Sequence, residues 1–417
     1  MTLTKETHYT RPTTQPKINV VDSIMGSGKT SWSIQYMNEA GSDRNFIYIT
    51  PFLDEVKRVK DSVTSRKFVA PANKGKGKLA NLKQLIINEN DIVSTHALFQ
   101  DADAELIDLL KISNYTLILD EAMNVVDQFP LDKDDFNLLI HNQMVSIEES
   151  TGFVRWNDES DYQNTVYNDV KNLAKTENLY FFENTVLFWT FPVSTFQAFE
   201  EVYIMTYLFQ AQQQKHYYDM YNLEYSYKAV EKLNETYVLV NHENRTPYDK
   251  TLMKSLINIY DGKLNNIGED ATALSKTWFT KERNIDIVPK LKKNIYTYFR
   301  RHSGTPAKLN MWTCFKNDIP KLKGEGYTKG FVPCNARATN DFKGKQSLAY
   351  TVNRFMNPYE YKFFKSKGAE VNQDMFALSE LIQWIWRSRI REGKEINLYI
   401  PSKRMRTILE NYLESTL

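Results

Sequence analysis

The eight residues 23–30, Ser-Ile-Met-Gly-Ser-Gly-Lys-Thr, constrain the fold more than any other stretch of the chain. An apolar run at 18–21 precedes them and is typical of a buried strand, and residues 31–40 after them can form a helix. A strand, a glycine-containing loop, Lys-Thr and a helix, in this order, are what a phosphate-binding loop requires. The full pattern has a glycine where this chain has Ser23, but the flanking strand and helix make the match specific. The stretch therefore predicts a nucleotide-binding α/β domain, with a fortuitous glycine turn as the alternative.

Each residue type in this loop has a chemical reason to be there. Gly26 and Gly28 permit backbone angles that other residues resist, so consecutive amides can turn toward phosphate oxygens. Lys29 would contact the β- and γ-phosphates, and Thr30 would bind Mg²⁺ at a helix N-terminus that favours anions. The residues expected to contact the nucleotide are Gly26, Ser27, Gly28, Lys29, Thr30 and Ser31.

Length and composition limit the other classes to which the chain could belong. Its 417 residues, 42% of them hydrophobic, indicate two domains with real cores. Cys314 and Cys334 are too few for a disulfide framework, and the six histidines show no metal-ligand spacing, so we expect no structural metal. No apolar run approaches the ~18 residues of a membrane span. The polar segment 1–17 lacks signal-peptide character and is expected to be a flexible lead-in, which predicts a soluble, intracellular protein.

Two acidic residues end another apolar run. Strands are predicted at 45–50, 91–95 and 115–119, and Asp120 and Glu121 follow the last of them. Acids at the end of a buried strand are costly unless they bind something. In a nucleotide-binding sheet this strand end faces the metal, so Asp120 would hold Mg²⁺ and Glu121 would orient and deprotonate the attacking water.

Strands that alternate with helices along the first half of the chain predict a parallel sheet. Further core strands are expected at 185–190 and 201–207, which extends the first domain over residues 18–222. The polar and acidic segment 131–180, with a hairpin across 150–152, is predicted to be an insertion in that domain.

A basic run from Lys57 to Lys83 contains nine Lys or Arg residues and one acid, Asp61. Glycines at 75 and 77 indicate that its middle is a loop. Two interpretations are open: a solvated surface, or a contact with a phosphate backbone, which needs clustered basic groups.

The second half of the chain, 223–417, has the pattern of another α/β domain. A polar segment at 225–304 is predicted to be helical. The strands predicted after it lie at 308–315, 330–333, 348–352 and 396–400.

A helix predicted at 379–391 carries the second group of candidate residues. Gln383, Arg387 and Arg391 are spaced i, i+4 and i+8 and would share one face, whereas Arg389 would point elsewhere. Arginines neutralise the charge that develops in phosphoryl transfer, and a glutamine suits the attacking water. The alternative interpretation is a basic surface helix with salt bridges.

Taken in order, these segments resemble the motifs of superfamily 2 DEAD-like helicases of the compact bacteriophage type. The matching segments are 23–30 for motif I, 48–51 for motif Ia, 94–96 for motif Ib, 120–123 for motif II, 205–207 for motif III, 312–315 for motif IV, 335–341 for motif V and 383–391 for motif VI. Motif II departs from the family by ending in Ala-Met, and motif III lacks the usual Ser/Thr-Ala-Thr. In motif VI the arginines are four residues apart instead of three, and Trp386 replaces a glycine, so Arg389 competes with Arg391 as the second arginine finger.

The resemblance implies two RecA-like parallel-sheet domains in tandem, with ATP and Mg²⁺ bound in the cleft between them. Lys29 and Glu121 would act in catalysis with Gln383, Arg387 and Arg391. The residues implied to grip a nucleic-acid strand are Thr50, Thr95, His96 and the run 57–83 on the first domain, and Asn335, Arg337 and Thr339 on the second, with Asn340 or Asp341 nearer the domain interface.

The implied function is an ATP-dependent DNA helicase or translocase in phage-type replication or recombination. It would work in the host cytoplasm on single-stranded or branched DNA, together with replication or recombination proteins. One alternative is a DNA-linked ATPase that remodels or anneals without unwinding. Another is an ATP-switched interaction module in which segments 131–180 and 225–304 are docking surfaces. Stimulation of hydrolysis by DNA would separate the motors from the switch.

Overall fold

The computed structural model describes residues 15–73, 75–157, 166–245, 250–335 and 341–415. Most of the flexible lead-in expected at residues 1–17 lies outside these ranges. The last residue of that segment belongs to a strand and is therefore not flexible as expected. Lys17 begins the first strand, β1 (Lys17–Asp22), and its ammonium lies 2.8 Å from a carboxylate oxygen of Glu201. No helix among the described residues is long and apolar enough to cross a membrane.

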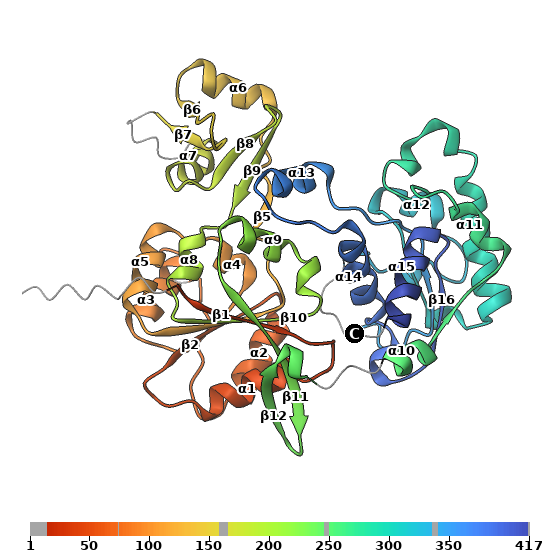
Figure 1. The fold of residues 1–417 in the computed structure, drawn as a ribbon, viewed down its shortest axis with the longest axis horizontal. Helices are drawn as coiled ribbons and strands as arrows, with labels where there is room; N and C mark the ends of the chain where they lie inside the picture. Colours follow the sequence, from red (N-terminus) through yellow and green to blue (C-terminus); the bar gives the residue numbers. More distant parts are fainter. Residues whose placement is uncertain (1–14, 74, 158–165, 246–249, 336–340, 416–417) are drawn as a thin grey trace, which may run out of the picture.

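A seven-stranded sheet organises the first half of the chain (Figure 1). Its strands in spatial order are β12 (Thr236–Asn241), β11 (Tyr225–Leu233), β1, β10 (Glu201–Thr206), β4 (Tyr115–Asp120), β2 (Asn45–Thr50) and β3 (Ile92–Thr95). All neighbours pair in parallel except β11 and β12, which are antiparallel. The predicted parallel α/β sheet is therefore confirmed.

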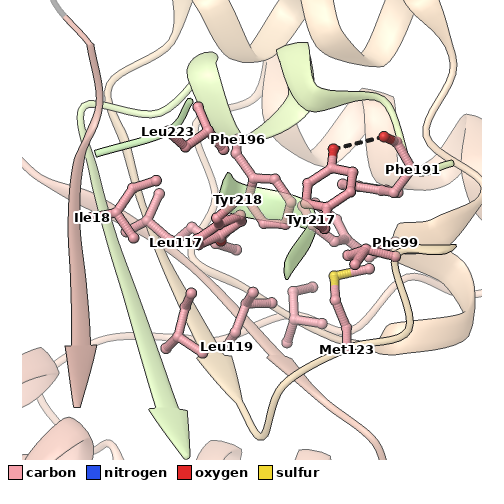
Figure 2. Close-up of a cluster of buried hydrophobic side chains, with 14 of the residues drawn as sticks. Ile18, Phe99, Leu117, Leu119, Met123, Phe191, Phe196, Tyr217, Tyr218 and Leu223 are labelled. Carbon is pink, nitrogen blue, oxygen red and sulfur yellow. Dashed lines mark hydrogen bonds between the residues drawn. The ribbon is translucent and has the colours of Figure 1, made fainter. Parts of the chain in front are cut away.

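Helices cover both faces of this sheet, which explains why its strands are apolar almost throughout (Figure 1). They are α1 (Lys29–Glu39), α2 (Leu53–Ser62), α3 (Lys78–Ile87), α4 (His96–Gln100), α5 (Ala104–Ile112), α8 (Val193–Gln197) and α9 (Gln213–Met220). Successive residues of a strand point to opposite faces of the sheet. Val20 therefore packs in the hydrophobic core on one face, and Val21 packs in the core on the other face. Figure 2 shows the first core, where the Tyr217 hydroxyl donates to the carbonyl of Phe191 at 2.7 Å.

The hairpin formed by β11 and β12 corrects the expected domain boundary. Residues 225–241 were predicted to be helical and to belong to the second domain, but β11 pairs with β1 and so extends the first sheet past residue 222. Asn234 has a φ of 57° in the two-residue turn before β12, a conformation that asparagine tolerates and that hairpins favour. Most residues of β11 and β12 are half-buried or exposed, as expected for a strand pair at the edge of a sheet.

The segment between β4 and β10 forms a small lobe with its own core, seen at the top of Figure 1. It contains β5 (Val126–Gln128), α6 (Lys133–His141), β6 (Val145–Ile147), β7 (Val154–Trp156), α7 (Asn168–Lys175), β8 (Leu179–Phe182) and β9 (Val186–Thr190). The predicted hairpin is confirmed, because β6 and β7 pair in antiparallel fashion. The strand expected in the main sheet at 185–190 is instead β9, which pairs with β5 and β8 in a separate antiparallel sheet. The insertion is therefore wider than 131–180.

A second, four-stranded sheet is parallel throughout. Its strands in spatial order are β13 (Ile257–Ile259), β16 (Ile396–Tyr399), β15 (Ser347–Tyr350) and β14 (Asn310–Thr313). The helices of this unit are α10 (Lys250–Leu256), α11 (Val288–Thr297), α12 (Ile319–Leu322), α13 (Pro358–Ser366), α14 (Gln373–Ile385) and α15 (Lys403–Glu414). The strand predicted at 330–333 is reduced to a single bridge between Phe331 and Trp312.

Helix α14 differs from the helix predicted at 379–391. It begins earlier, because the Asn372 side chain accepts hydrogen bonds from the amides of Asp374 and Met375, each at 3.0 Å. It ends at Ile385, and a separate 3₁₀ turn follows from Arg389 to Glu392, so the three residues of the predicted stripe do not lie on one continuous helix.

Candidate functional site

The loop between β1 and α1 has the backbone that the sequence predicts. Gly26 and Gly28 have φ angles of 86° and 97°, in the region that only glycine adopts freely. Helix α1 begins at Lys29, directly after the second glycine. The orphan amides of the first helical turn therefore open toward the cleft next to the loop.

Ser23 stands where the usual pattern has a glycine, and its side chain has a role. Its φ is not positive, so this position does not require a glycine. The Ser23 hydroxyl is buried and accepts a hydrogen bond from the amide of Val230 in β11 at 2.9 Å. The serine thus attaches the loop to the hairpin at the sheet edge.

Lys29 lies inside the loop. Its ammonium donates to the carbonyl oxygens of Ser23 and Ile24, the latter at 3.1 Å. Burial lowers its pKa, and the negative charges of Glu121, Asp22 and Asp120 oppose that shift. A buried cation beside acidic groups is the arrangement expected of a residue that exchanges loop carbonyls for phosphate oxygens.

The two acids at the end of β4 lie at the floor of the same cleft. Burial, reinforced by the charges of Glu121 and Glu55, raises the pKa of Asp120 to about 7. The hydroxyl of Thr50 lies 3.5 Å from its carboxylate. Glu121 has a φ of 69°, and its amide donates to the carbonyl of Met205 at 3.0 Å. A left-handed glutamate is strained, which is common at functional sites and places its side chain in the cleft.

The opposite wall of the cleft comes from the second unit. Gln383, Trp386, Arg387 and Arg391 line it, together with the loop and the two acids, around a volume of about 360 Å³. The three predicted residues converge there although α14 ends at Ile385 and the backbone is extended at Ser388, before the 3₁₀ turn that carries Arg391. Arg389 does not line the cleft, and its Nε donates to the carbonyl of Glu395.

Several residues of the cleft were missed by sequence reasoning. Tyr237 of β12 lies against the loop: a Cβ atom added to Gly28 would lie only 2.1 Å from its ring. Glu55 and Arg58 of α2, whose side chains lie 3.1 Å apart, also line the cleft. The available signals for the hairpin that carries Tyr237 were the alternation of apolar and polar residues at 225–229 and the apolar run at 237–240.

A larger cavity of about 850 Å³ lies on the other side of the loop, between β11 and the helices α10, α14 and α15. Asp22 lines it, but its carboxylate accepts the amides of Leu208 and Phe209, each at 2.9 Å, and so holds the turn after β10. Burial raises the pKa of Asp22. Ser27, one of the residues expected to contact the nucleotide, lines this cavity and not the smaller cleft. Lys29, Asp120 and Glu121 line only the smaller cleft, which therefore collects most of the predicted groups.

The residues expected to grip a nucleic-acid strand are not gathered on one surface. Thr50 is fully buried beside Asp120, and the His96 ring is buried with Nε2 3.0 Å from the Asp120 carbonyl oxygen, so neither is accessible to a strand. Thr95 ends β3 and is half-buried, whereas Asn335 is exposed. Arg337, Thr339 and Asn340 lie outside the described residues, and Asp341 is exposed.

The basic run 57–83 divides into structural and exposed residues. Arg66 is half-buried, donates to the carbonyls of Met37 and Ala40 at 2.9 Å, and pairs with Asp91 at 3.4 Å. Lys83 pairs with Asp103 at 2.6 Å and with Glu105. The exposed residues without an ion pair among the described part of the chain are Lys57, Lys60, Lys67, Lys76 and Lys78.

The cleft has the chemistry to hold a nucleotide and Mg²⁺. The open loop and the Lys29 ammonium suit phosphate oxygens, and Gly26, Gly28, Thr30 and Ser31 line the cleft beside them. A divalent cation would favour the ionised form of Asp120, whose pKa burial has raised. The described residues contain no cluster of three metal-ligating side chains. Thr30 and Asp120 could therefore supply only part of the coordination shell, which is how Mg²⁺ is usually held in phosphate sites.

The fold and the cleft define an α/β protein in which two parallel-sheet units face each other across a site built from both. The chain belongs to the YonV family. The SPbeta prophage-derived protein YonV of Bacillus subtilis (strain 168) is 46% identical over 412 residues, which cover 96% of this chain and 99% of that protein. The family descriptions that match are the YonV middle domain, at 126–189, and the YonV C-terminal Rossmann-like domain, at 251–413. The first matches the lobe, and the second begins after the β11–β12 hairpin.

Among solved structures, "XPD_Helicase" is similar with a TM-score of 0.47 and 9% identity, covering 95% of each chain. The structure of S. tokodaii Xpd4 is similar with a TM-score of 0.47 and 10% identity, covering 96% of this chain and 94% of that chain. Both likenesses are remote, and no residue role or activity follows from them.

Proposed function

We propose that this chain is an ATP-hydrolysing helicase or translocase that acts on DNA. The observation that carries the proposal is the composition of the cleft: the loop, Asp120 and Glu121 come from the first unit, and Arg387 and Arg391 come from the second. A site assembled from two units is complete only when they are close together. Binding and hydrolysis of a nucleotide would therefore couple to relative movement of the units.

The first unit would bind the phosphates and prepare the water. The Lys29 ammonium would leave the loop carbonyls to contact the β- and γ-phosphates, and the loop amides would contact phosphate oxygens. Mg²⁺, held by Thr30 and Asp120, would supply positive charge to the phosphates. Glu121, held in position by its strained backbone, would orient and deprotonate the attacking water.

The second unit would stabilise the charge that develops during transfer. Arg387 and Arg391 approach the position of the γ-phosphate across the cleft, and Gln383 lies beside them. Loss of the γ-phosphate removes the group that holds these arginines to the first unit. Hydrolysis would thereby release the second unit and allow a step along a nucleic-acid strand.

The exposed lysines of the run 57–83 and the exposed Asn335 are the described groups best placed to contact such a strand. The prophage origin of the related YonV protein supports replication or recombination of phage DNA in a host cytoplasm as the setting. Proteins of those processes would then be partners.

The proposal is tested by steady-state ATP hydrolysis, with and without single-stranded DNA, for the wild-type protein, Arg387→Ala and Arg389→Ala. We expect DNA to stimulate the wild type, and Arg387→Ala to lower the stimulated rate by about 10³-fold or more, the range known for arginine fingers. Arg389→Ala is the matched control, because this arginine lies two residues away but outside the cleft. Hydrolysis that is indifferent to DNA would favour an ATP-switched interaction module, and an unaffected Arg387→Ala enzyme would remove Arg387 from the site.

A further inference from the structure

Positive charge is concentrated in one part of the second unit. Between residues 281 and 345 the chain contains fifteen Lys or Arg and five Asp or Glu, an excess of ten positive charges, whereas the whole chain has a net charge of only +2. The rest of the chain is therefore net negative. An asymmetry of this size between parts of one protein indicates a surface for a polyanion.

Much of this charge lies on the exposed side of one helical stretch. Helix α11 continues into a π-helical turn at Tyr298–Ser303, and Val288, Leu291 and Ile295 face the core. Helical spacing puts Lys292, Lys293 and Arg300 together on the opposite side, and all three are exposed. Tyr296, 41% exposed, lies between them on the same side.

Neighbouring elements extend this surface. Helix α11 contacts α12, which is followed by the exposed Lys323. Lys290 and Arg301 lie on the edge of the same helical stretch. We define the outer basic face as Lys290, Lys292, Lys293, Arg300, Arg301 and Lys323. Within the described ranges, none of these six residues has an ion pair, in contrast to Arg66 and Lys83 of the run 57–83.

The outer basic face is separate from the cleft. Figure 1 shows α11 on the side of the second unit that faces away from the first sheet, with α12 next to it. None of the six residues lines the cleft of about 360 Å³. A ligand bound to this face would therefore leave the nucleotide site and the arginines of the second unit accessible.

The geometry of this face suits duplex DNA. From Lys292 to Arg300 the helix advances by eight residues, a rise of about 12 Å. That distance is similar to the roughly 12 Å width of the B-DNA major groove, across which two phosphate backbones face each other. Proteins that bind single strands rely on several stacked aromatic rings in a groove, whereas this helical side exposes one aromatic ring, Tyr296.

We propose that the outer basic face binds the phosphate backbone of duplex DNA, at a site distinct from the nucleotide cleft. The contact is electrostatic and independent of base sequence. It goes beyond the proposed motor function, because it requires no ATP and would hold the protein on duplex DNA while the cleft works on a strand.

The test is equilibrium binding of a short blunt DNA duplex, followed by fluorescence anisotropy over a range of salt concentrations. The variant Lys292→Gln/Lys293→Gln/Arg300→Gln removes three charges of the face. Because each phosphate contact contributes about one unit to the slope of log K against log salt, we expect the slope to fall in magnitude by about 2 to 3 and the affinity at low salt to fall at least tenfold. An unchanged slope would overturn the proposal.

The matched control is Lys133→Gln/Lys175→Gln/Lys365→Gln, which removes three exposed lysines that lie on the lobe and on α13 and have no ion pair in the described part of the chain. It carries the same change in net charge and should bind duplex DNA like the wild type. Equal losses in both triple variants would also overturn the proposal, because they would reflect total charge alone. If the triple variant of the outer basic face loses binding to single strands or to anionic vesicles but retains duplex binding, the face binds those ligands and not duplex DNA.

ATP hydrolysis stimulated by single-stranded DNA separates this proposal from the motor function. The triple variant of the outer basic face should retain that stimulation, since none of its three residues touches the cleft. Arg387→Ala should lose stimulation and retain duplex binding. Each proposal can therefore fail without the other.

Discussion

Ser23, at the start of the loop between β1 and α1, stabilises the fold at the position where the usual loop pattern has a glycine. The Ser23 hydroxyl is the hydrogen-bond acceptor for the buried amide of Val230, and both residues are less than 10% exposed. Removal of the hydroxyl would leave this buried amide without its protein partner.

We therefore predict that Ser23→Gly, although it restores the usual loop pattern, lowers the free energy of unfolding by about 1–3 kcal/mol. Urea denaturation followed by circular dichroism measures the change. Ser27→Ala is the matched control in the same loop, because the Ser27 hydroxyl is buried without a hydrogen-bond partner and its removal should change stability little. A Ser23→Gly protein as stable as the wild type would show that the hairpin does not depend on this bond.

At the scale of elements, local sequence patterns predict the strands in the interior of the sheet, and the loops that follow them, better than the strands at its edge. The loop at 23–30 and the acids after β4 follow from apolar runs and glycines that leave few alternatives. The β11–β12 hairpin did not follow, because it is an edge of the sheet and its half-exposed residues include Glu231 and Lys232. Its partner strand, β1, is about two hundred residues away in sequence, and local pattern carries no information about that pairing.

Helix α14 gives the converse lesson. Its length and its end were predicted wrongly, yet Gln383, Arg387 and Arg391 all line the cleft. The amides of Arg387 and Ser388 bond to carbonyls three residues earlier, which tightens the chain after Ile385, and Ser388 itself is extended. A 3₁₀ turn aligns residues three apart and not four apart, so the spacing of the predicted helix is not what brings Arg387 and Arg391 to the same cleft.

The hairpin also supplies Tyr237, the aromatic ring next to the loop, and we predict that this ring packs against the base or sugar of a bound nucleotide. Tyr237→Ala should raise the KM for ATP about tenfold, within the 1–3 kcal/mol that a stacked aromatic ring contributes, and should leave kcat within about twofold. Steady-state kinetics with varied ATP measure both constants.

Tyr237→Phe is the control for this prediction, since it keeps the ring against Gly28 and removes only the hydroxyl. It should retain the wild-type KM. If Tyr237→Ala lowers kcat instead of raising KM, the ring positions the loop and does not contact the nucleotide.

On the scale of the whole molecule, the two units contact each other at several places besides the cleft. The Gln212 amide donates to the Ser379 hydroxyl at 2.9 Å, and the hydroxyls of Tyr207 and Tyr412 are hydrogen-bonded. Helix α13 of the second unit packs on the first unit and on the lobe through Phe363 and Phe364. Movement of the second unit relative to the first must therefore strain or break the contacts of α13. Through these contacts the lobe is coupled to the cleft.

His216 of α9 lies at this contact, 1% exposed, with its ring centroid 5.5 Å from that of Phe364. Burial, with a smaller contribution from the charge of Lys215, lowers its pKa to about 4. At pH values between about 4 and the ordinary pKa near 6.5, the His216 ring binds a proton in the unfolded chain but not in the folded protein. The contribution of His216 to stability is therefore complete above about pH 6.5 and is lost as the pH falls toward 4.

Asp120 and Glu360, whose pKa values burial raises to about 7, act in the opposite direction, because they favour the folded protein as the pH falls. The prediction therefore concerns the difference between a variant and the wild type. We expect His216→Leu to gain about 2 kcal/mol in free energy of unfolding relative to the wild type between pH 7.5 and pH 5, since leucine has no proton to exclude. Urea denaturation at several pH values measures this difference.

The control is His141→Leu, at an exposed site on α6, whose stability should follow that of the wild type at every pH. Parallel pH profiles for His216→Leu and the wild type would mean that His216 gains its proton without separating α13 from the first unit.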